Sequence, residues 1–197
     1  MTSQGAATLE WVAAGLGILN ITLLVRRSVW NYPFGLAMVS LYASVFWRQR
    51  LYAEAVLQGF FFLAQAWGWW LWYRTLQREE AVSQVPVRWL DSWSRAVWAV
   101  ATLALALNLG LVLNRFTDAA MPFADAAIAG ASVTAQILLG FRRVENWIVW
   151  ILVDVVAVGL YVNRALYPTA GLYVLFLGIS VMGLREWIGA ARREAQA

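Results

Sequence analysis

The chain has 197 residues, of which 62% are hydrophobic and only 13% are charged, and its mean hydropathy is +0.62. A soluble domain is about 45–50% apolar and about 25% charged, so this composition excludes a soluble globular protein. One membrane-spanning helix needs roughly 20 apolar residues, so the chain has room for at most about eight or nine spans. No length remains for a second, soluble domain.

The residue types that are missing exclude several kinds of chemistry. The sequence has no His and no Cys, and all 15 basic residues are Arg. These absences exclude zinc and haem sites built on His or Cys, iron–sulfur clusters, thiol nucleophiles and imidazole proton relays. The absence of Lys excludes a retinal Schiff base. No converging pair of carboxylates and no Gly-rich phosphate loop is visible, so we expect no enzyme, no metal site and no bound cofactor.

Apolar stretches bounded by charged or turn residues predict seven membrane spans. The N-terminal segment lacks a basic region and a clear cleavage site, so we expect the first span to stay in the mature protein. The longest connection, residues 74–95, is charged, contains Pro86 and is the candidate linker. We therefore expect an all-α integral membrane protein with one transmembrane domain over residues 1–197. In chain order the spans are residues 9–25, 29–47, 52–73, 96–113, 119–140, 147–162 and 166–188.

The arginines between the spans predict the orientation of the chain, because cytoplasmic loops close to spans hold the excess of positive residues. One side of the membrane would carry Arg48, Arg50, Arg115 and Arg164. The other eleven arginines fall on the opposite side, which predicts an outer N-terminus and a cytoplasmic C-terminus. The net charge of +4 is then explained by topology in a lipid bilayer, and no nucleic-acid partner is expected.

The sequence repeats itself at an offset of 115 residues, without gaps. The three spans within residues 9–73 therefore match the three spans within residues 119–188, and the span at 96–113 has no counterpart. A three-span unit ends on the side opposite its start and one extra helix brings the chain back, so the two repeats would run parallel, as in some transporters. This predicts two parallel three-helix repeats joined by a linker helix, a 3+1+3 plan. The identical pairs are Asn31 with Asn146, Leu51 with Leu166, Tyr52 with Tyr167, Ala55 with Ala170, Leu57 with Leu172, Gly68 with Gly183 and Trp72 with Trp187.

Polar and aromatic residues inside the third and sixth spans are the candidates for substrate binding, because polar groups in a membrane usually face the interior of a bundle. Within each span the spacing places them on one face of the helix. At about 1.5 Å rise per residue, Asp154 and Gln65 lie roughly 12 Å from the cytoplasmic side, and Trp150 and Trp69 roughly 6 Å. A flat aromatic ring could stack on the indoles, and the carboxylate would favour a cationic ring. The predicted substrate-binding residues are Trp147, Trp150, Asp154, Gln58, Gln65 and Trp69.

Each of these residue types also has a purely structural interpretation. The two glutamines could hold helices together, and Asp154 could be protonated or satisfied by an Arg or a hydroxyl. Asn31 and Asn146 begin spans and are expected to cap them. Tryptophans at span ends are expected in the interfacial belts; they are Trp11, Trp30, Trp47, Trp72 and Trp187.

Several blocks of sequence resemble the PnuC family of nicotinamide riboside transporters. In the first half these are residues 30–35 (WNYPFG), 51–54 (LYAE), Gln58 and 67–72 (WGWWLW). In the second half they are residues 145–150 (ENWIVW), Asp154, 166–167 (LY) and 183–187 (GLREW). The resemblance covers nearly the whole chain.

The resemblance implies a seven-helix vitamin-precursor transporter of the bacterial cell or inner membrane, often a homotrimer. Its members pass unphosphorylated nicotinamide riboside inward for NAD biosynthesis, and a cytoplasmic kinase traps it as the nucleotide. The family's Trp-x-x-Trp motif matches Trp147 and Trp150. Riboside transporters often have Asn, three residues and then Tyr-Gly-Trp in the third span, where this chain has Leu63 and residues 67–69 (WGW).

Three functions stay open at this point. The first is passive uptake of a vitamin-like riboside. The second is passive or proton-coupled transport of thiamine, riboflavin or a nucleoside, with Asp154 as the titrating acid. The third is a membrane scaffold that transports nothing.

Overall fold

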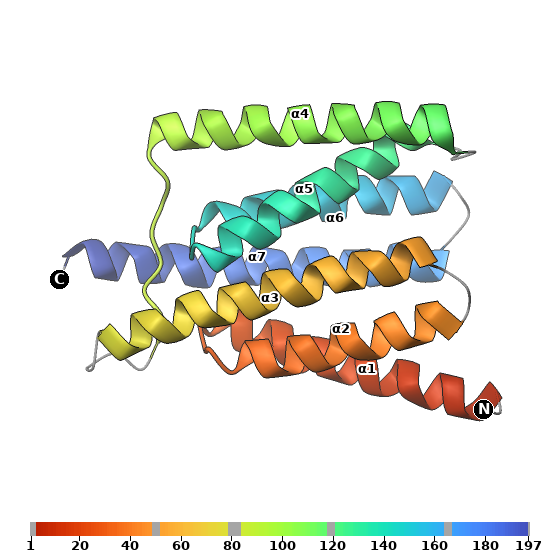
Figure 1. Cartoon of the computed structure of the whole chain (residues 1–197). Helices are drawn as coiled ribbons and strands as arrows, with labels where there is room; N and C mark the ends of the chain where they lie inside the picture. Colours follow the sequence, from red (N-terminus) through yellow and green to blue (C-terminus); the bar gives the residue numbers. More distant parts are fainter. Residues whose placement is uncertain (1–2, 49–51, 79–83, 118–120, 164–166, 197) are drawn as a thin grey trace. The chain divides into compact units, whose positions relative to one another are not determined.

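The computed structural model describes residues 3–48, 52–78, 84–117, 121–163 and 167–196 (Figure 1). Within these ranges the chain is all-helical and forms seven helices, without a strand. Each helix overlaps one predicted span. The helices are α1 (Ser3–Val25), α2 (Asn31–Arg48), α3 (Tyr52–Arg78), α4 (Ser92–Phe116), α5 (Pro122–Gly140), α6 (Glu145–Asn163) and α7 (Tyr167–Gln196).

Four of the described helices are long and apolar enough to cross a membrane: α4, α5, α6 and α7 from Ala170 onward. The residues of α1 from Gly15 to Val25 form a shorter apolar segment. Helices α2 and α3 are long enough, but α2 contains an Asn, two Tyr and a Trp, and α3 contains four Trp, two Tyr and three Gln. These residues lower hydropathy even where they suit a membrane interface. The prediction of a multi-helix membrane protein is therefore confirmed at this coarser level. The first residues of two predicted spans, Ala119 and Leu166, lie outside the described residues.

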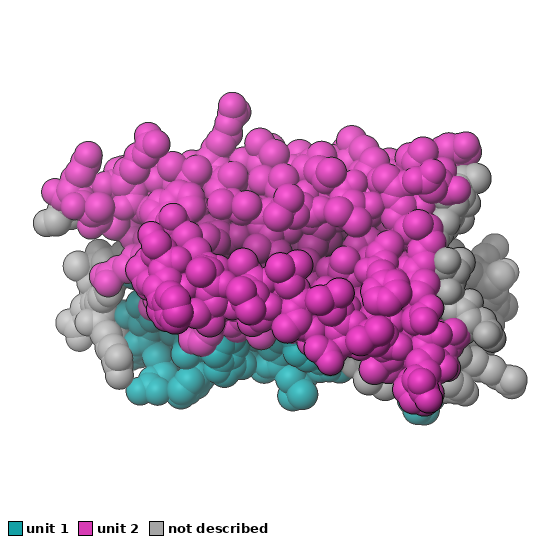
Figure 2. Space-filling model, turned by 90° about the horizontal axis from the view of Figure 1, so that it is seen from above, with its two compact units in different colours: residues 1–86 teal, residues 87–197 magenta. Residues whose placement is uncertain are grey.

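The chain divides into two compact units, residues 1–86 and residues 87–197, which Figure 2 shows in two colours. In the first unit α2 packs against both α1 and α3. In the second unit each helix packs against the next one along the chain, from α4 to α7. The boundary falls at Pro86, inside the predicted linker.

The corner between α1 and α2 recurs 115 residues later between α5 and α6. Arg27 and Arg142 both have positive φ, 57° and 60°. Each donates its backbone N–H to a carbonyl three residues back, at 2.9 and 2.8 Å, and the next residue donates to a carbonyl five residues back. This pair of bonds is a Schellman motif, which closes a helix with a residue in the left-handed region. The two halves therefore share local backbone geometry as well as sequence.

Asn31 and Asn146 stabilise these corners in a way that differs from the predicted capping. An N-cap side chain accepts a hydrogen bond from a backbone N–H ahead of it. Here the Asn31 amide donates to the carbonyl oxygen of Ser28 at 2.7 Å, and the Asn146 amide donates to that of Arg143 at 2.6 Å. The prediction of an N-cap was wrong, because both side chains face back into the turn.

Trp72 and Trp187 are buried in the packing of their units, so the prediction that they belong to interfacial belts was wrong. The Trp72 ring meets Tyr32 edge-on at 5.3 Å, and the Trp187 ring meets Trp147 edge-on at 5.7 Å. Aromatic pairs favour this arrangement. Trp30 and Trp47 are exposed, as expected of belt residues, and the side chain of Trp11 lies outside what the structure describes.

Hydrogen bonds from Val85, Val87 and Leu90 fix the described part of the linker. In the first unit Val85 donates its N–H to the carbonyl of Arg27, and the Arg27 guanidinium donates to the carbonyl of Val85. In the second unit Leu90 donates its N–H to the Glu145 carboxylate, and Val87 donates to Glu194. Residues 84–90 of the linker thus form an ordered extended segment.

Helix α4 begins at a capped end just after the linker. The Asp91 carboxylate accepts hydrogen bonds from the Ser94 hydroxyl at 2.6 Å and from the Ser94 N–H at 2.9 Å. These bonds, the hydroxyl first, hold the pKa of Asp91 below its usual value. The start of α4 is therefore set by a side-chain cap, four residues before the predicted span at 96–113.

Candidate functional site

Asp154 is buried in the middle of α6, with 3% of its surface exposed. The Ser180 hydroxyl on α7 donates to its Oδ2 at 2.9 Å, and no arginine pairs with Asp154 in the described part of the chain. Of the two partners that the sequence left open for Asp154, an Arg or a hydroxyl, the structure therefore has the hydroxyl. One hydroxyl donor leaves most of the four acceptor positions of a carboxylate unused. An acid inside a membrane span is a functional candidate by default.

The two tryptophans of the Trp-x-x-Trp motif lie in different surroundings on α6. Trp147 is 1% exposed, and its ring lies directly against Gly183, where an added Cβ would come within 2.6 Å of three ring atoms. Its Nε1–H is buried and has no hydrogen-bond acceptor among the described residues. Trp150 is half-buried, one helical turn before Asp154. Trp150 is therefore the more accessible indole of the pair.

The three predicted residues on α3 belong to the first unit. Gln65 is buried, with 8% exposed, and Trp69 is 37% exposed one turn further on. Gln58 is half-buried, two turns before Gln65. The Gln65 amide lies against Gly35 of α2, so closely that a Cβ there would collide with its Oε1. All six predicted residues thus lie on α3 or α6, three in each unit.

Three residues that lie beside these candidates were not predicted to belong to the site: Asn20, Gly35 and Ser180. Asn20 on α1 donates to the carbonyl of Asn31 at 2.7 Å and, like Gln65, lies against Gly35. Ser180 holds Asp154. The repeat contained the signal, because an offset of 115 pairs Gln65 with Ser180 and Gly35 with Trp150. These pairs are not identical, so sequence identity between the halves does not reveal them.

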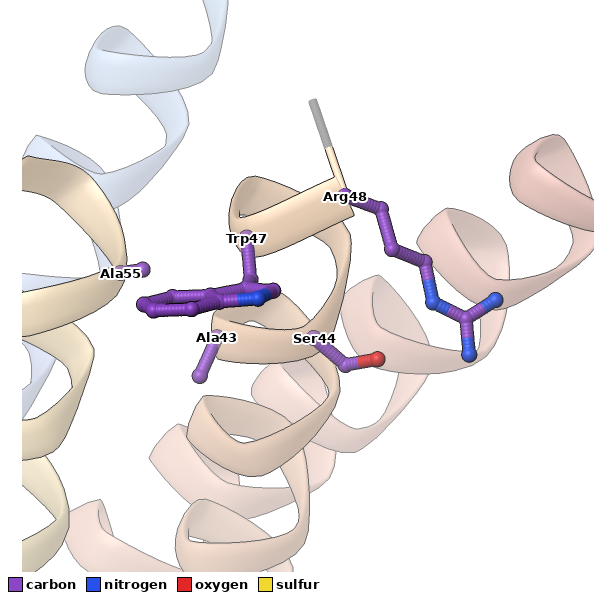
Figure 3. A pocket seen from close by; sticks show the side chains of 5 residues that line it. All are labelled: Ala43, Ser44, Trp47, Arg48 and Ala55. Atoms are coloured by element: carbon purple, nitrogen blue, oxygen red, sulfur yellow. The ribbon is translucent and has the colours of Figure 1, made fainter. Parts of the chain in front are cut away.

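A hollow of about 360 Å³ lies between the end of α2 and the start of α3 in the first unit (Figure 3). Trp47 and Ala55 form its apolar part, and the side chains of Ser44 and Arg48 lie at its edge. It contains none of the six predicted residues, and we assign no function to it.

Comparison with known proteins identifies the family. The nicotinamide mononucleotide transporter family matches residues 7–189, nearly the whole chain. The chain belongs to the nicotinamide mononucleotide transporter family. This confirms the resemblance to PnuC proteins noted in the sequence.

Similar members of the family carry names with different substrates. The chain is 30% identical to the nicotinamide riboside transporter PnuC of Escherichia coli, with 95% of this chain and 89% of that protein covered. It is 26% identical to PnuC of Neisseria mucosa, over 93% of this chain and 73% of that protein. It is 27% identical to the riboflavin/roseoflavin transporter RibM of Streptomyces davaonensis, over 92% and 84%.

A solved structure has the same fold. The crystal structure of the vitamin B3 transporter PnuC matches with a TM-score of 0.76 at 27% identity, covering 95% of this chain and 83% of that one. The family is therefore one of multi-pass membrane transporters, to which this chain belongs by sequence and by fold.

Proposed function

We propose that this chain is a facilitated transporter that takes up nicotinamide riboside for NAD synthesis. The observation that carries the proposal is its similarity over 93–95% of its length to two proteins named nicotinamide riboside transporter. Nicotinamide riboside has a flat, positively charged pyridinium ring. A half-buried indole one turn from a carboxylate whose described partner is a hydroxyl, as at Trp150 and Asp154, suits such a ring by stacking and by charge.

We propose that the substrate is bound by the residues predicted on α3 and α6. On α6, Trp150 and Asp154 would contact the ring, and Trp147, which is buried against Gly183, would hold the start of the helix. On α3, the remaining three residues would supply amides and an indole; they are Gln58, Gln65 and Trp69. A facilitated transporter releases its substrate chemically unchanged, so none of these residues has a catalytic role in the proposal.

We also propose the finer architecture as a hypothesis. Residues 1–197 would form one transmembrane domain of the inner membrane, with its N-terminus outside and its C-terminus in the cytoplasm. Repeat one (9–73), the linker helix (96–113) and repeat two (119–188) would follow the 3+1+3 plan, and three copies would assemble. The shared corners at Arg27 and Arg142 support the repeat, and the arginine distribution supports the orientation.

A second candidate function is transport of riboflavin or of another vitamin or nucleoside, passive or proton-coupled. The similarity to the riboflavin/roseoflavin transporter RibM favours it. A proton-coupled mechanism would use Asp154 as the group that takes up and releases the proton.

The deciding experiment measures binding of nicotinamide riboside, thiamine, riboflavin and uridine to the purified protein by calorimetry. We expect nicotinamide riboside to bind most tightly. Asp154→Asn should weaken its binding more than that of uncharged riboflavin, because the carboxylate attracts only the cation. Glu186→Gln, which removes an exposed carboxylate on α7 outside the predicted site, serves as the matched control. Tight binding of riboflavin without binding of nicotinamide riboside would instead establish the second candidate.

A further inference from the structure

Two amide side chains from different helices meet at a glycine of a third helix in the first unit. Asn20 comes from α1, Gly35 from α2 and Gln65 from α3. A Cβ on Gly35 would lie 2.6 Å from Asn20 Nδ2 and would collide with Gln65 Oε1. The missing side chain of Gly35 therefore leaves the space that the two amides occupy.

The two amides differ in how they are satisfied. Asn20 Nδ2 donates to the carbonyl oxygen of Asn31 at 2.7 Å, which fixes the side chain. Gln65 is more than nine-tenths buried, and its amide makes no hydrogen bond to any residue that the structure describes. Buried amides almost always have a partner, since an unmade hydrogen bond is costly away from water. Gln65 is thus a buried donor and acceptor available to a ligand.

Packing alone does not require amides at this helix crossing. In the second unit the positions 115 residues later are Ala135, Trp150 and Ser180. There the glycine is replaced by a tryptophan, and the two amides are replaced by small side chains. The second half of the chain thus does without amides at the corresponding positions. Glutamine that only joined helices would be bonded across the interface, and Gln65 is not.

We propose that Asn20 and Gln65 form a hydrogen-bonding site for an uncharged polar group of the transported substrate, a carboxamide or a hydroxyl. Neutral amides both donate and accept, so they match a group of that kind. Asn20 becomes a substrate-contacting residue beside Gln65, and Gly35 keeps the amides in place. The proposal rests on the proposed transport function for the identity of its ligand.

The test compares three variants with a matched glycine control in the purified full chain. Asn20→Ala and Gln65→Ala each remove one amide, and Gly35→Ala displaces the Gln65 amide without removing it. Gly59→Ala on α3 is the control, because nothing lies within 4 Å of a Cβ there. Thermal unfolding without ligand checks the fold, and calorimetry gives the affinity for nicotinamide riboside, riboflavin, thiamine and uridine.

We expect Asn20→Ala and Gln65→Ala each to weaken binding of the preferred ligand about three- to tenfold, the loss of one net hydrogen bond. Gly35→Ala should weaken it similarly but add little to Gln65→Ala, since both act on one amide. Gly59→Ala should bind as the wild type. If Gly35→Ala fails to fold, the two amide variants decide.

The outcomes separate this proposal from the proposed function. If the wild type prefers riboflavin, the assignment of nicotinamide riboside fails, while the amide variants measured with riboflavin still decide whether the site exists. Wild-type affinity in folded Asn20→Ala and Gln65→Ala overturns the amide site and leaves the transported substrate unaffected. A wild type that binds none of the four ligands overturns both.

Discussion

Gly183 shows how one absent side chain sets the packing of a tryptophan. The Trp147 ring occupies the space that a Cβ on Gly183 would need, and the Trp187 ring packs against it edge-on. Gly68 has the same relation to Tyr32 in the first unit, where an added Cβ would come within 2.7 Å of the hydroxyl oxygen. Neither glycine has a positive φ, so close approach of a ring explains both.

Gly183→Ala should therefore destabilise the protein by about 1–3 kcal/mol, the usual effect of overpacking. The indole is rigid and buried, so it cannot move aside as a flexible chain would. Gly178→Ala on the same helix is the matched control, since nothing lies within 4 Å of its Cβ. Thermal unfolding of both variants in detergent measures the difference. Equal midpoints would mean that the Trp147 ring has room to shift.

Trp150→Ala should weaken substrate binding about tenfold. Stacking on an aromatic side chain contributes about 1–3 kcal/mol per base in nucleic-acid complexes, and about 1.4 kcal/mol corresponds to tenfold. Calorimetry on the folded variant gives the affinity. Trp93→Ala on α4 is the control, because that indole is 77% exposed and should affect binding little. A folded Trp150→Ala with wild-type affinity would remove this indole from the site.

Sequence patterns alone could not separate the roles of the tryptophans. Trp72 and Trp187 stand at span ends like Trp30 and Trp47, yet the first two are buried and the other two exposed. Burial depends on which ring faces a neighbouring helix, as Trp72 faces Tyr32 and Trp187 faces Trp147, and that is a property of the helix pair. The third-span and sixth-span faces could be predicted because helical spacing is local. Asn20 and Ser180 lie on other helices, so spacing could not reveal them.

At the scale of helices, hydropathy predicted every element and misplaced several ends. Helix α3 continues from Tyr73 to Arg78, and α7 continues past Ile188 to Gln196. The added residues include polar helix formers such as Arg, Glu and Gln. They end the apolar stretch, but they do not end the helix. A membrane span is the part of a helix that is apolar enough for lipid. The helix itself extends as far as its backbone hydrogen bonds, so the two do not have to end at the same residue.

The junction of the linker with α4 and α6 depends on Glu145. Its carboxylate accepts hydrogen bonds from the N–H of Leu90 and, at 2.8 Å, from Arg95 Nε, and it lies in the first turn of α6. A negative charge at a helix N-terminus is favourable. Nothing in the hydropathy pattern indicates this contact, because its partners are 50 and 55 residues away.

Glu145→Ala should lower the free energy of unfolding by about 2 kcal/mol, since hydrogen bonds to charged groups contribute about 1.5–3 kcal/mol. Thermal or denaturant unfolding measures it. Glu186→Ala is the control: this exposed acid lies 3.8 Å from Arg193, and such surface pairs contribute little. Similar losses in both variants would argue against a special role for the linker junction.

At the scale of the whole molecule, the arginine distribution makes topology testable. A reporter fused to the C-terminus should be active in the cytoplasm, and one fused to the N-terminus should be active outside. Cysteines introduced one at a time into the connections, followed by impermeant labelling, give an independent readout. Activity of the C-terminal reporter only outside would reverse the orientation.

Transport should need neither ATP nor a proton gradient. The sequence has no Gly-rich phosphate loop, so nothing in it suggests a nucleotide site. In proteoliposomes the internal concentration of nicotinamide riboside should rise to the external concentration and stop there, with or without an uncoupler. Accumulation beyond that level in the absence of a kinase would favour the proton-coupled alternative through Asp154.

The recurring corners at Arg27 and Arg142 have a consequence for how such a chain could arise. A tandem gene duplication gives two copies of one structural solution, and selection then acts on each copy separately. The backbone of the corner is the same at both places, whereas the residue eight positions after the corner arginine is Gly35 in one and Trp150 in the other. A chain that arose by duplication can thus carry an indole at one position and a glycine at its counterpart, a difference that a homodimer of identical chains cannot have.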